Sequence, residues 1–366
     1  MVILCFSLPS EVWAAEEESA VKVSAKAALL LDAQTGQVLW QKDGYEQLPP
    51  ASTTKILTAL LCLDIAPPDR VAEVTAQAAA VGESSAGLLA GERFAMGELL
   101  DAALLKSAND ACFALAEGAV GSEPFFVRLM NLKAAVLGAA GANLLNTNGL
   151  PAEGHSMSCY DLAVLARVAM QNPNFAARVG SVYGVMEGGS YNRKLKNTNK
   201  LLQMDKHITG IKTGTTDAAG ACLVSSMERD GRSLIAVVLH SGDRYEDSLR
   251  LLNWGVDRFV NCCVVRQGQV LGAWPTADGE EIAVQAATDL WLTLPVDNGT
   301  PDVELRTEFA WCKLPELSPI KVGDVLGTVY FYGDEECLGQ VNLLAAAEYQ
   351  PSRWQMFWGR LTGEVK

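Results

Sequence analysis

Three short strings in this chain hold the residue types that a serine acyl-transfer site requires. In chain order they are Ser52-Thr-Thr-Lys55, Ser107-Ala-Asn109 and Lys212-Thr-Gly214. A serine and a lysine three residues apart on a helix share one face, about one turn apart. The amine of Lys55 can then accept the hydroxyl proton of Ser52. The strings therefore predict a serine nucleophile with a lysine base and without a histidine.

Sequence context separates these strings from other copies of the same patterns. S-x-x-K also occurs at Ser19 and Ser318, and S-x-N also occurs at Ser190. Ser19 lies beside an acidic stretch, and Ser318 precedes a proline that favours extended backbone. Ser52 instead opens the apolar run 56–63, which predicts a buried helix whose N-terminal dipole favours a serine alkoxide.

The second and third strings lie where secondary structure is expected to change. Residues 98–105 have helical spacing and lead into Ser107, and an apolar face resumes beyond Asn109, so we expect a junction between two helices there. The K-T-G string at 212–214 occurs once and precedes two apolar strands. A strand edge of this kind can pair with an extended peptide, and a glycine lets the peptide backbone approach. Alone, the triplet would also fit a hairpin with an exposed lysine.

The motif set is the one found in penicillin-binding proteins and class A β-lactamases. Much of residues 24–262 resembles the D-alanyl-D-alanine carboxypeptidases, the low-molecular-mass penicillin-binding proteins. The segments that carry the resemblance are 50–55, 82–85, 91–92, 107–111, 148–150, 197–202, 210–214, 216–220 and 251–255. The resemblance implies an α/β plus all-helical, transpeptidase-like catalytic domain.

The resemblance also implies how the first two strings act. Ser52 would attack the carbonyl between the two terminal D-alanines of a peptidoglycan stem peptide, and β-lactams would acylate the same serine. Lys55 must be neutral to act as the base, and burial and the positive charge of Lys212 would both lower its pKa. Ser107 would relay a proton toward the departing amine, and Asn109 would bond the substrate amide.

The third string is suited to the end of the substrate. Lys212, Thr213 and Thr215 can bind a C-terminal carboxylate, which an internal peptide bond lacks, so the resemblance implies an exopeptidase. Gly214 belongs to the same binding string, and Arg244 is a weaker candidate for the carboxylate site. The backbone N–H groups of Ser52 and Thr215 would form the oxyanion hole.

Two other functions fit the same strings. Class A β-lactamases use a glutamate to activate the deacylating water; the nearest candidates are Glu123 and Glu153, and the middle string is S-A-N rather than S-D-N. A penicilloyl-sensing or inactive binding domain could keep all three strings, but it would normally be joined to a transmembrane or signalling segment, which this sequence does not show. Transpeptidation would differ only in having an amine, rather than water, take the acyl group.

The composition argues against metals, organic cofactors and nucleic acid. The three histidines form no H-E-x-x-H, the nine cysteines form no C-x-x-C, and neither G-x-S-x-G nor a phosphate-binding glycine loop occurs. The formal net charge of −14 disfavours nucleic acid as a partner. We therefore expect an enzyme without a metal or other cofactor.

Four segments are expected along the chain. Residues 1–15 fit the apolar core and cleavage site of a signal peptide without its basic start, although a plain apolar extension is the alternative. Residues 22–263 form the catalytic domain, and the short strands within 268–348 predict a small all-β sandwich. The segment 351–363 is the fourth.

The segment 351–363 has the pattern of a short amphipathic helix. Trp354, Phe357, Trp358 and Leu361 recur at i, i+3, i+4 and i+7, which suits a helix lying in a membrane interface. The alternative is a helix packed on the β domain. With the leader, this pattern predicts an exported enzyme that is peripheral on the outer face of the cytoplasmic membrane.

Overall fold

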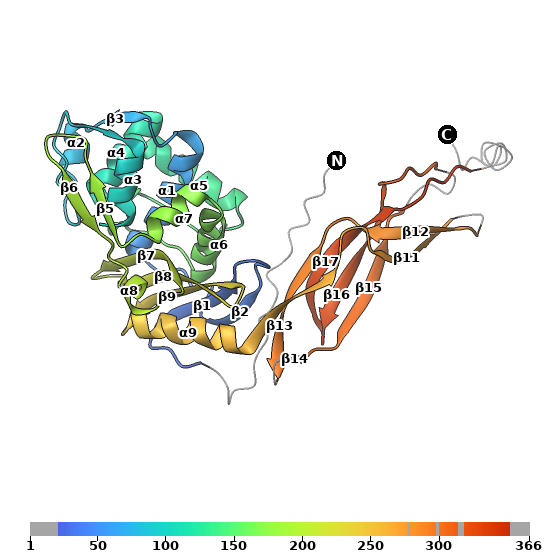
Figure 1. Cartoon of the computed structure of the whole chain (residues 1–366). Helices are drawn as coiled ribbons and strands as arrows, with labels where there is room; N and C mark the ends of the chain where they lie inside the picture. Colours follow the sequence, from blue (N-terminus) through green and yellow to red (C-terminus); the bar gives the residue numbers. More distant parts are fainter. Residues whose placement is uncertain (1–20, 277–278, 298–299, 314–317, 352–366) are drawn as a thin grey trace. The chain divides into compact units, whose positions relative to one another are not determined.

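The chain forms two compact units, divided between Asp257 and Arg258 (Figure 1). The computed structural model describes residues 21–276, 279–297, 300–313 and 318–351. The expected leader at 1–15 and nearly all of the amphipathic segment 351–363 lie outside the described residues.

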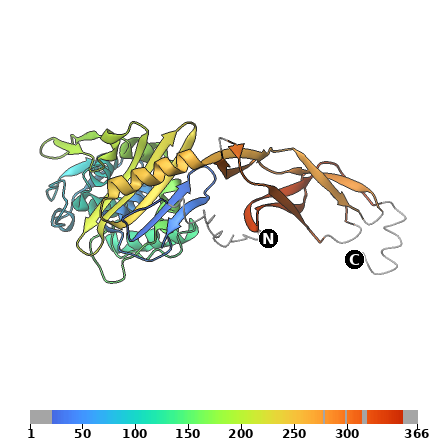
Figure 2. The ribbon, with the colours of Figure 1, turned by 90° about the horizontal axis from the view of Figure 1, so that it is seen from below.

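An antiparallel sheet with the order β2-β1-β9-β8-β7 lies within the catalytic unit. Its strands are β1 (Ala27–Asp32), β2 (Val38–Lys42), β7 (Ile208–Thr216), β8 (Gly220–Arg229) and β9 (Arg232–Ser241). Leu29 and Leu31 face the main core, and Leu30 lies against Gly255 of α9 (Arg244–Arg258). Because both faces of the sheet are covered, β1 is a continuous apolar run rather than an alternating one (Figure 2).

Helices cover the face of this sheet opposite α9 (Figure 1). The central one is α1 (Lys55–Ile65), whose residues 55–62 are all buried. It packs against α3 (Met96–Leu104), α4 (Asn109–Val120), α5 (Glu123–Val136), α6 (Cys159–Met170) and α7 (Pro173–Val179). A helix that is buried on all sides is mostly apolar all round, which explains the apolar run 56–63, in which Thr58 is the one polar residue.

Several short elements complete the catalytic unit. They are the 3-10 turn η2 (Ala51–Thr54), the helices α2 (Ala76–Ala79) and α8 (Leu201–Met204), the ribbon of β3 (Val71–Glu73) with β4 (Arg93–Ala95), and the hairpin of β5 (Tyr183–Met186) with β6 (Arg193–Lys196). Ser190, the second copy of S-x-N, lies in the turn of this hairpin.

The C-terminal unit is all-β in its described residues. One sheet joins β10 (Phe259–Val265), β13 (Leu290–Asp297) and β14 (Thr300–Pro301), and the other has the order β11-β12-β17-β16-β15. The strands of the second sheet are β11 (Val270–Pro275), β12 (Glu281–Ala286), β15 (Leu305–Trp311), β16 (Val325–Gly333) and β17 (Glu336–Ala345). This confirms the expected fold of an α/β plus helical domain followed by a small all-β domain. Because β10 pairs with β13, the β unit begins a few residues before the expected boundary.

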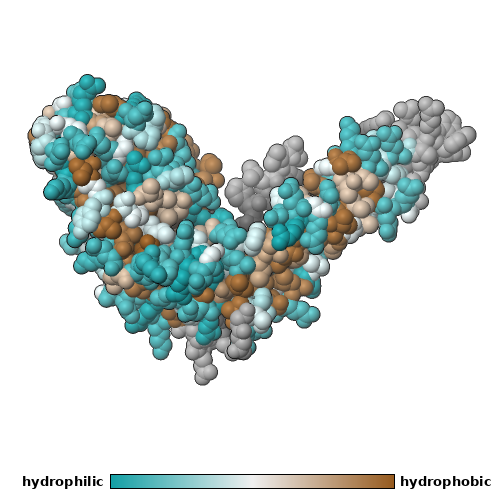
Figure 3. All heavy atoms as spheres, in the orientation of Figure 1, coloured by the Kyte–Doolittle hydropathy of each residue, from teal (hydrophilic) through white to brown (hydrophobic). Residues whose placement is uncertain are grey.

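The surface of each unit mixes polar and apolar residues, and hydrophobic residues gather along part of the β unit (Figure 3). Among the described residues, no helix is long and apolar enough to cross a bilayer. The eight described cysteines are free. Those of the catalytic unit, Cys62, Cys112, Cys159 and Cys222, are buried, whereas Cys312 and Cys337 of the β unit are exposed.

Candidate active site

Ser52 lies in the 3-10 turn η2, which runs directly into α1. The Thr53 hydroxyl donates to the Pro50 carbonyl at 2.6 Å, and the Thr54 hydroxyl donates to the Ala51 carbonyl at 2.9 Å, so the turn is closed by its own side chains. The serine itself is half-buried at the N-terminal end of the helix. The expected start of a buried helix is therefore present, with the serine one turn before the helix proper.

Lys55 is fully buried, and its ammonium has three acceptors. Nζ donates to Ser52 Oγ at 2.8 Å, to Asn109 Oδ1 at 2.8 Å and to the Asn148 carbonyl at 2.6 Å. Burial lowers the pKa of Lys55 to about 8, and the negative charges of Glu83 and Asp110 act in the opposite direction. Burial, rather than the charge of Lys212, is thus the main cause of the expected shift. A lysine with this pKa can lose its proton near neutral pH and then accept one from Ser52.

The second string lies at the junction that the sequence predicted. Ser107 links α3 to α4 with φ of +64°, a strained left-handed conformation for a serine. Asn109 begins α4, and its side chain bonds on both sides: Oδ1 accepts from Lys55, and Nδ2 donates to the Gly82 carbonyl at 3.0 Å. The asparagine is therefore held between the lysine and the segment that follows α2.

The third string lies on the edge strand β7, close to the nucleophile. Lys212 and Thr213 are 1% and 5% exposed. Burial, and then the positive charge of Lys55, lower the pKa of Lys212 well below its usual value. A Cβ at Gly214 would lie 3.0 Å from the backbone nitrogen of Ser52, so only glycine lets the strand approach the turn this closely.

Arg244 reaches the same strand from the start of α9. Its Nη1 donates to the Gly214 carbonyl and to Thr215 Oγ1, both at 2.7 Å. Thr215 is exposed and Arg244 is half-buried. Eight of the nine residues that the sequence singled out are thus gathered around one turn and one strand edge, and the ninth, Ser107, lies two residues before Asn109.

Sequence reasoning gave no role to two supports, which lie in or beside the matching segments 148–150 and 197–202, and both contain the string N-T-N. In residues 146–148, Asn146 Oδ1 accepts the backbone N–H groups of Asn148 and Gly149, and this turn directs the Asn148 carbonyl at Lys55. In residues 197–199, Asn197 Oδ1 accepts the N–H of Asn199. Such asparagine turns are a recognisable local signal, and a repeated N-T-N could have pointed to both supports.

His155 is a third support, to which the sequence analysis gave no role. Its Nδ1 accepts from the Leu145 N–H at 3.1 Å, so the ring proton lies on Nε2, 3.0 Å from Thr54 Oγ1. Burial lowers the pKa of His155 to about 4, so the ring is neutral. His155 therefore stabilises the turn that carries Ser52 through its contact with Thr54.

The structure describes both carboxylates that were considered for a β-lactamase. Glu123 accepts from the Thr147 N–H at 3.1 Å. Glu153 is exposed on the wall of a pocket of about 230 Å³ beside the Ser52 turn. Within the described part of the chain, neither is hydrogen-bonded to Ser52 or Lys55.

Comparison with known proteins agrees with this geometry. The family model described as D-alanyl-D-alanine carboxypeptidase matches residues 14–242. This chain belongs to that family. The model of the penicillin-binding protein 5 C-terminal domain matches residues 263–350. The resemblance drawn from the motifs is confirmed.

The matched relatives extend over most of the chain. D-alanyl-D-alanine carboxypeptidase DacF of Bacillus subtilis is 29% identical over 93% of this chain and 90% of its own length. DacD of Salmonella typhimurium is 32% identical over 88% of this chain and 85% of its own length.

Solved structures show the same fold. Penicillin-binding protein 5 from Haemophilus influenzae has a TM-score of 0.79 at 22% identity, covering 90% of this chain and 98% of its own. A D-alanyl-D-alanine carboxypeptidase from Mycobacterium tuberculosis has a TM-score of 0.62 at 30% identity, covering 64% of this chain and 92% of its own.

Proposed function

We propose that this chain is a serine-type D-Ala-D-Ala carboxypeptidase, which removes the terminal D-alanine from peptidoglycan stem peptides through an acyl-enzyme on Ser52. The observation that carries the proposal is the buried Lys55 ammonium, 2.8 Å from Ser52 Oγ and oriented by Asn109 and Asn148. Membership of the carboxypeptidase family supports the reaction class.

Acylation starts when neutral Lys55 takes the proton of Ser52 and the serine oxygen attacks the carbonyl between the D-alanines. The negative charge on the carbonyl oxygen would be stabilised by the backbone N–H groups of Ser52 and Thr215. Ser107 relays the proton that Lys55 holds to the departing D-alanine amine, which returns Lys55 to its neutral form. Water then attacks the acyl-enzyme with Lys55 again as the base, which releases the shortened peptide.

The positive groups on and beside β7 give the enzyme its preference for the C-terminal end of a peptide. Lys212, Thr213 and Thr215 bind the C-terminal carboxylate, and Arg244 adds a second positive charge beside Thr215. Two buried ammonium groups, on Lys55 and Lys212, repel each other, so one of the two lysines is favoured in its neutral form when no substrate is bound. When the substrate carboxylate binds, it favours the charged form of Lys212. A peptide without a free carboxylate would lose this stabilisation, which makes the enzyme an exopeptidase.

The substrate also determines where the enzyme acts. Peptidoglycan lies outside the cytoplasm, so we propose an exported enzyme, held at the outer face of the cytoplasmic membrane by the segment 351–363. Binding of the full chain to anionic lipid vesicles, lost on truncation after residue 350, would support this anchor. Equal binding by both proteins would contradict it.

The direct test is D-alanine release from a peptide ending in Lys-D-Ala-D-Ala. The intact protein should release D-alanine, and Ser52→Ala should reduce the rate by at least about a thousandfold while keeping the same unfolding temperature. β-Lactams should acylate the intact protein at Ser52 only. No release by the folded intact protein would reject the carboxypeptidase proposal for this substrate and favour a β-lactamase or a penicilloyl sensor.

A further inference from the structure

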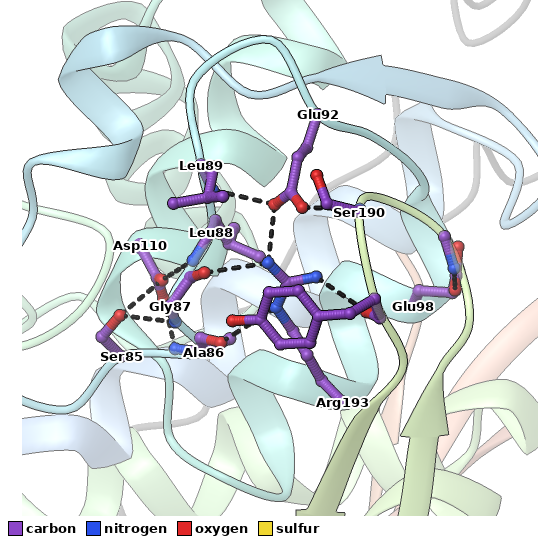
Figure 4. A network of polar contacts seen from close by, with 12 residues as sticks. Ser85, Ala86, Gly87, Leu88, Leu89, Glu92, Glu98, Asp110, Ser190 and Arg193 are labelled. Atoms are coloured by element: carbon purple, nitrogen blue, oxygen red, sulfur yellow. Dashed lines mark hydrogen bonds and ion pairs between the residues drawn. The ribbon is translucent and has the colours of Figure 1, made fainter.

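The turn of the β5–β6 hairpin is clamped by two carboxylates from another part of the chain (Figure 4). Glu98 Oε1 accepts the N–H groups of Glu187 and Gly188 at 2.7 and 2.8 Å. Glu92 Oε1 accepts the N–H of Ser190 at 2.7 Å. The hairpin turn is therefore fixed to the loop between α2 and β4 and to the first turn of α3.

A buried ion pair forms the centre of this clamp. Arg193 Nη2 and Glu92 Oε2 are 2.7 Å apart, and both side chains are 5% exposed. Arg193 also donates to the carbonyls of Ala86 and Gly87, at 3.2 and 2.9 Å. Burial raises the pKa of Glu92, but hydrogen bonds from the backbone and from Arg193 outweigh it and bring that pKa to about 2, so the pair stays ionised.

The segment 84–92, which contains Glu92 and the two carbonyls that Arg193 bonds, is itself hydrogen-bonded to the start of α4. Asp110 Oδ1 accepts the N–H of Ala86 at 3.0 Å, and Oδ2 accepts the N–H of Leu88 at 3.1 Å and the Ser85 hydroxyl at 2.6 Å. The preceding residue, Asn109, donates its N–H to the Ser84 carbonyl at 2.7 Å. Arg193 thus connects, through one short segment, to the asparagine that holds Lys55.

The other end of the hairpin touches the opposite side of the site. The Thr198 N–H donates to the Leu105 carbonyl at 3.0 Å, close to Ser107 in the chain. Its hydroxyl lies 2.6 Å from the hydroxyl of Thr213 on β7. The segment that follows β6 therefore contacts the end of α3, two residues before Ser107, and the Lys212-Thr-Gly214 strand.

We propose that the β5–β6 hairpin is a strut that sets the separation of these two strings, and that Arg193 is a positioning residue for Asn109. Without Arg193, Glu92 would be a buried charge without its cationic partner, so the segment 84–92 would have to rearrange and release its contacts with the start of α4. Asn109 would then no longer hold Lys55 against Ser52. The inference rests on the proposed function of these strings.

A double-mutant cycle tests whether Arg193 acts through Asn109. The rate constant for acylation by benzylpenicillin is measured for the full chain, Arg193→Met, Asn109→Ala and the double variant, with folding checked by circular dichroism. Arg193→Met should slow acylation about 10- to 100-fold alone but less than about threefold when Asn109 is already alanine. Equal losses in both backgrounds, or no loss, would overturn the proposal.

Arg193→Lys provides a second cycle if the methionine variant does not fold. It keeps the positive charge near Glu92 but not the guanidinium donors to Ala86 and Gly87, so acylation should be intermediate and still coupled to Asn109. An Arg193→Lys effect that is independent of Asn109 would also reject the strut.

Arg232→Met is the matched control. Arg232 is 7% exposed against 6% for Arg193, and it donates to the carbonyls of Gly255 and Val256 on α9. Its loss should lower the unfolding temperature without coupling to Asn109, and equal coupling would indicate a general loss of structure instead of a strut. Because the readout is β-lactam acylation, the cycle can be read even if no D-alanine is released, which separates this inference from the proposed function.

Discussion

The two units bury different kinds of side chain. The catalytic unit buries Lys55, Lys212 and the Glu92–Arg193 pair, whereas the described residues of the β unit bury only Thr276 and Thr293 among polar side chains. Burying a polar group is unfavourable unless hydrogen bonds compensate it, and burying a charge is more so. The catalytic unit therefore gives up stability to hold charges in fixed positions, whereas the described residues of the β unit carry no comparable cost.

Backbone strain is distributed in the same unequal way. Ala51 and Ser107, which flank or belong to the serine strings, both have positive φ. The β unit has a positive φ at Asp334, in a hairpin turn, where aspartate tolerates this conformation. Strain next to the nucleophile indicates that the fold over-determines those positions.

The largest effect should come from Gly149→Ala, which removes the space behind the nucleophile. Gly149 has φ of +84°, and a Cβ there would overlap the Ala51 carbonyl oxygen. Acylation by benzylpenicillin, followed by mass spectrometry, should fall more than about a hundredfold, since the Ser52 turn must move. Gly138→Ala is the control, because φ is +93° and the site is open; it should only lower stability, by about 1 kcal/mol. Equal acylation by both variants would contradict the expectation.

The pH dependence of acylation tests whether Lys55 is the base and whether burial lowers its pKa. Its pKa is lowered from 10.5 to about 8, so the neutral base is scarce below pH 8. The rate should rise about fiftyfold from pH 6 to pH 8, because the neutral fraction of Lys55 changes about tenfold per pH unit below its pKa, and it should level off above about pH 9. For this group, the stability penalty is complete below about pH 8 and disappears as pH rises toward 10.5. A flat rate profile from pH 6 to 9 would reject Lys55 as the base.

A smaller and more selective effect is expected from Arg244→Gln. A charge-assisted hydrogen bond contributes about 1.5–3 kcal/mol, so kcat/KM for a peptide ending in D-Ala-D-Ala should fall about 10- to 100-fold. The same peptide with a C-terminal amide should be affected much less. Arg250→Gln, which breaks a surface pair with Glu246 on the same helix, should change neither rate. A loss of equal size on the acid and the amide would argue against a carboxylate role for Arg244.

The smallest effect on catalysis should come from the β unit. Trp311 stacks on Phe309 with ring centroids 5.4 Å apart. Trp311→Ser should lower stability by about 1 kcal/mol and leave kcat/KM within about twofold. Lost activity in a fully folded variant would show that packing in the β unit affects catalysis in the catalytic unit.

How much of this the sequence could predict depends on how local each signal is. The strings at Ser52 and Lys212, the apolar runs and the turn residues are local, and together with the family resemblance they predicted the fold. The roles of the site residues stay predictions. The pair of Glu92 with Arg193 spans 101 positions, and the bond from Lys55 to the Asn148 carbonyl spans 93. No periodicity relates such distant residues, because only the packed fold brings them together.

The buried thiols offer a way to time motions of the catalytic unit. Cys112 lies one turn into α4, the helix that begins with Asn109, and burial raises the pKa of its thiol to about 11. A thiol-specific reagent would label the exposed Cys312 and Cys337 of the folded protein at once. Modification of Cys112 must wait until α4 opens. The delay between labelling of the exposed thiols and labelling of Cys112 therefore measures the rate at which α4 opens, the helix whose first residue, Asn109, holds Lys55.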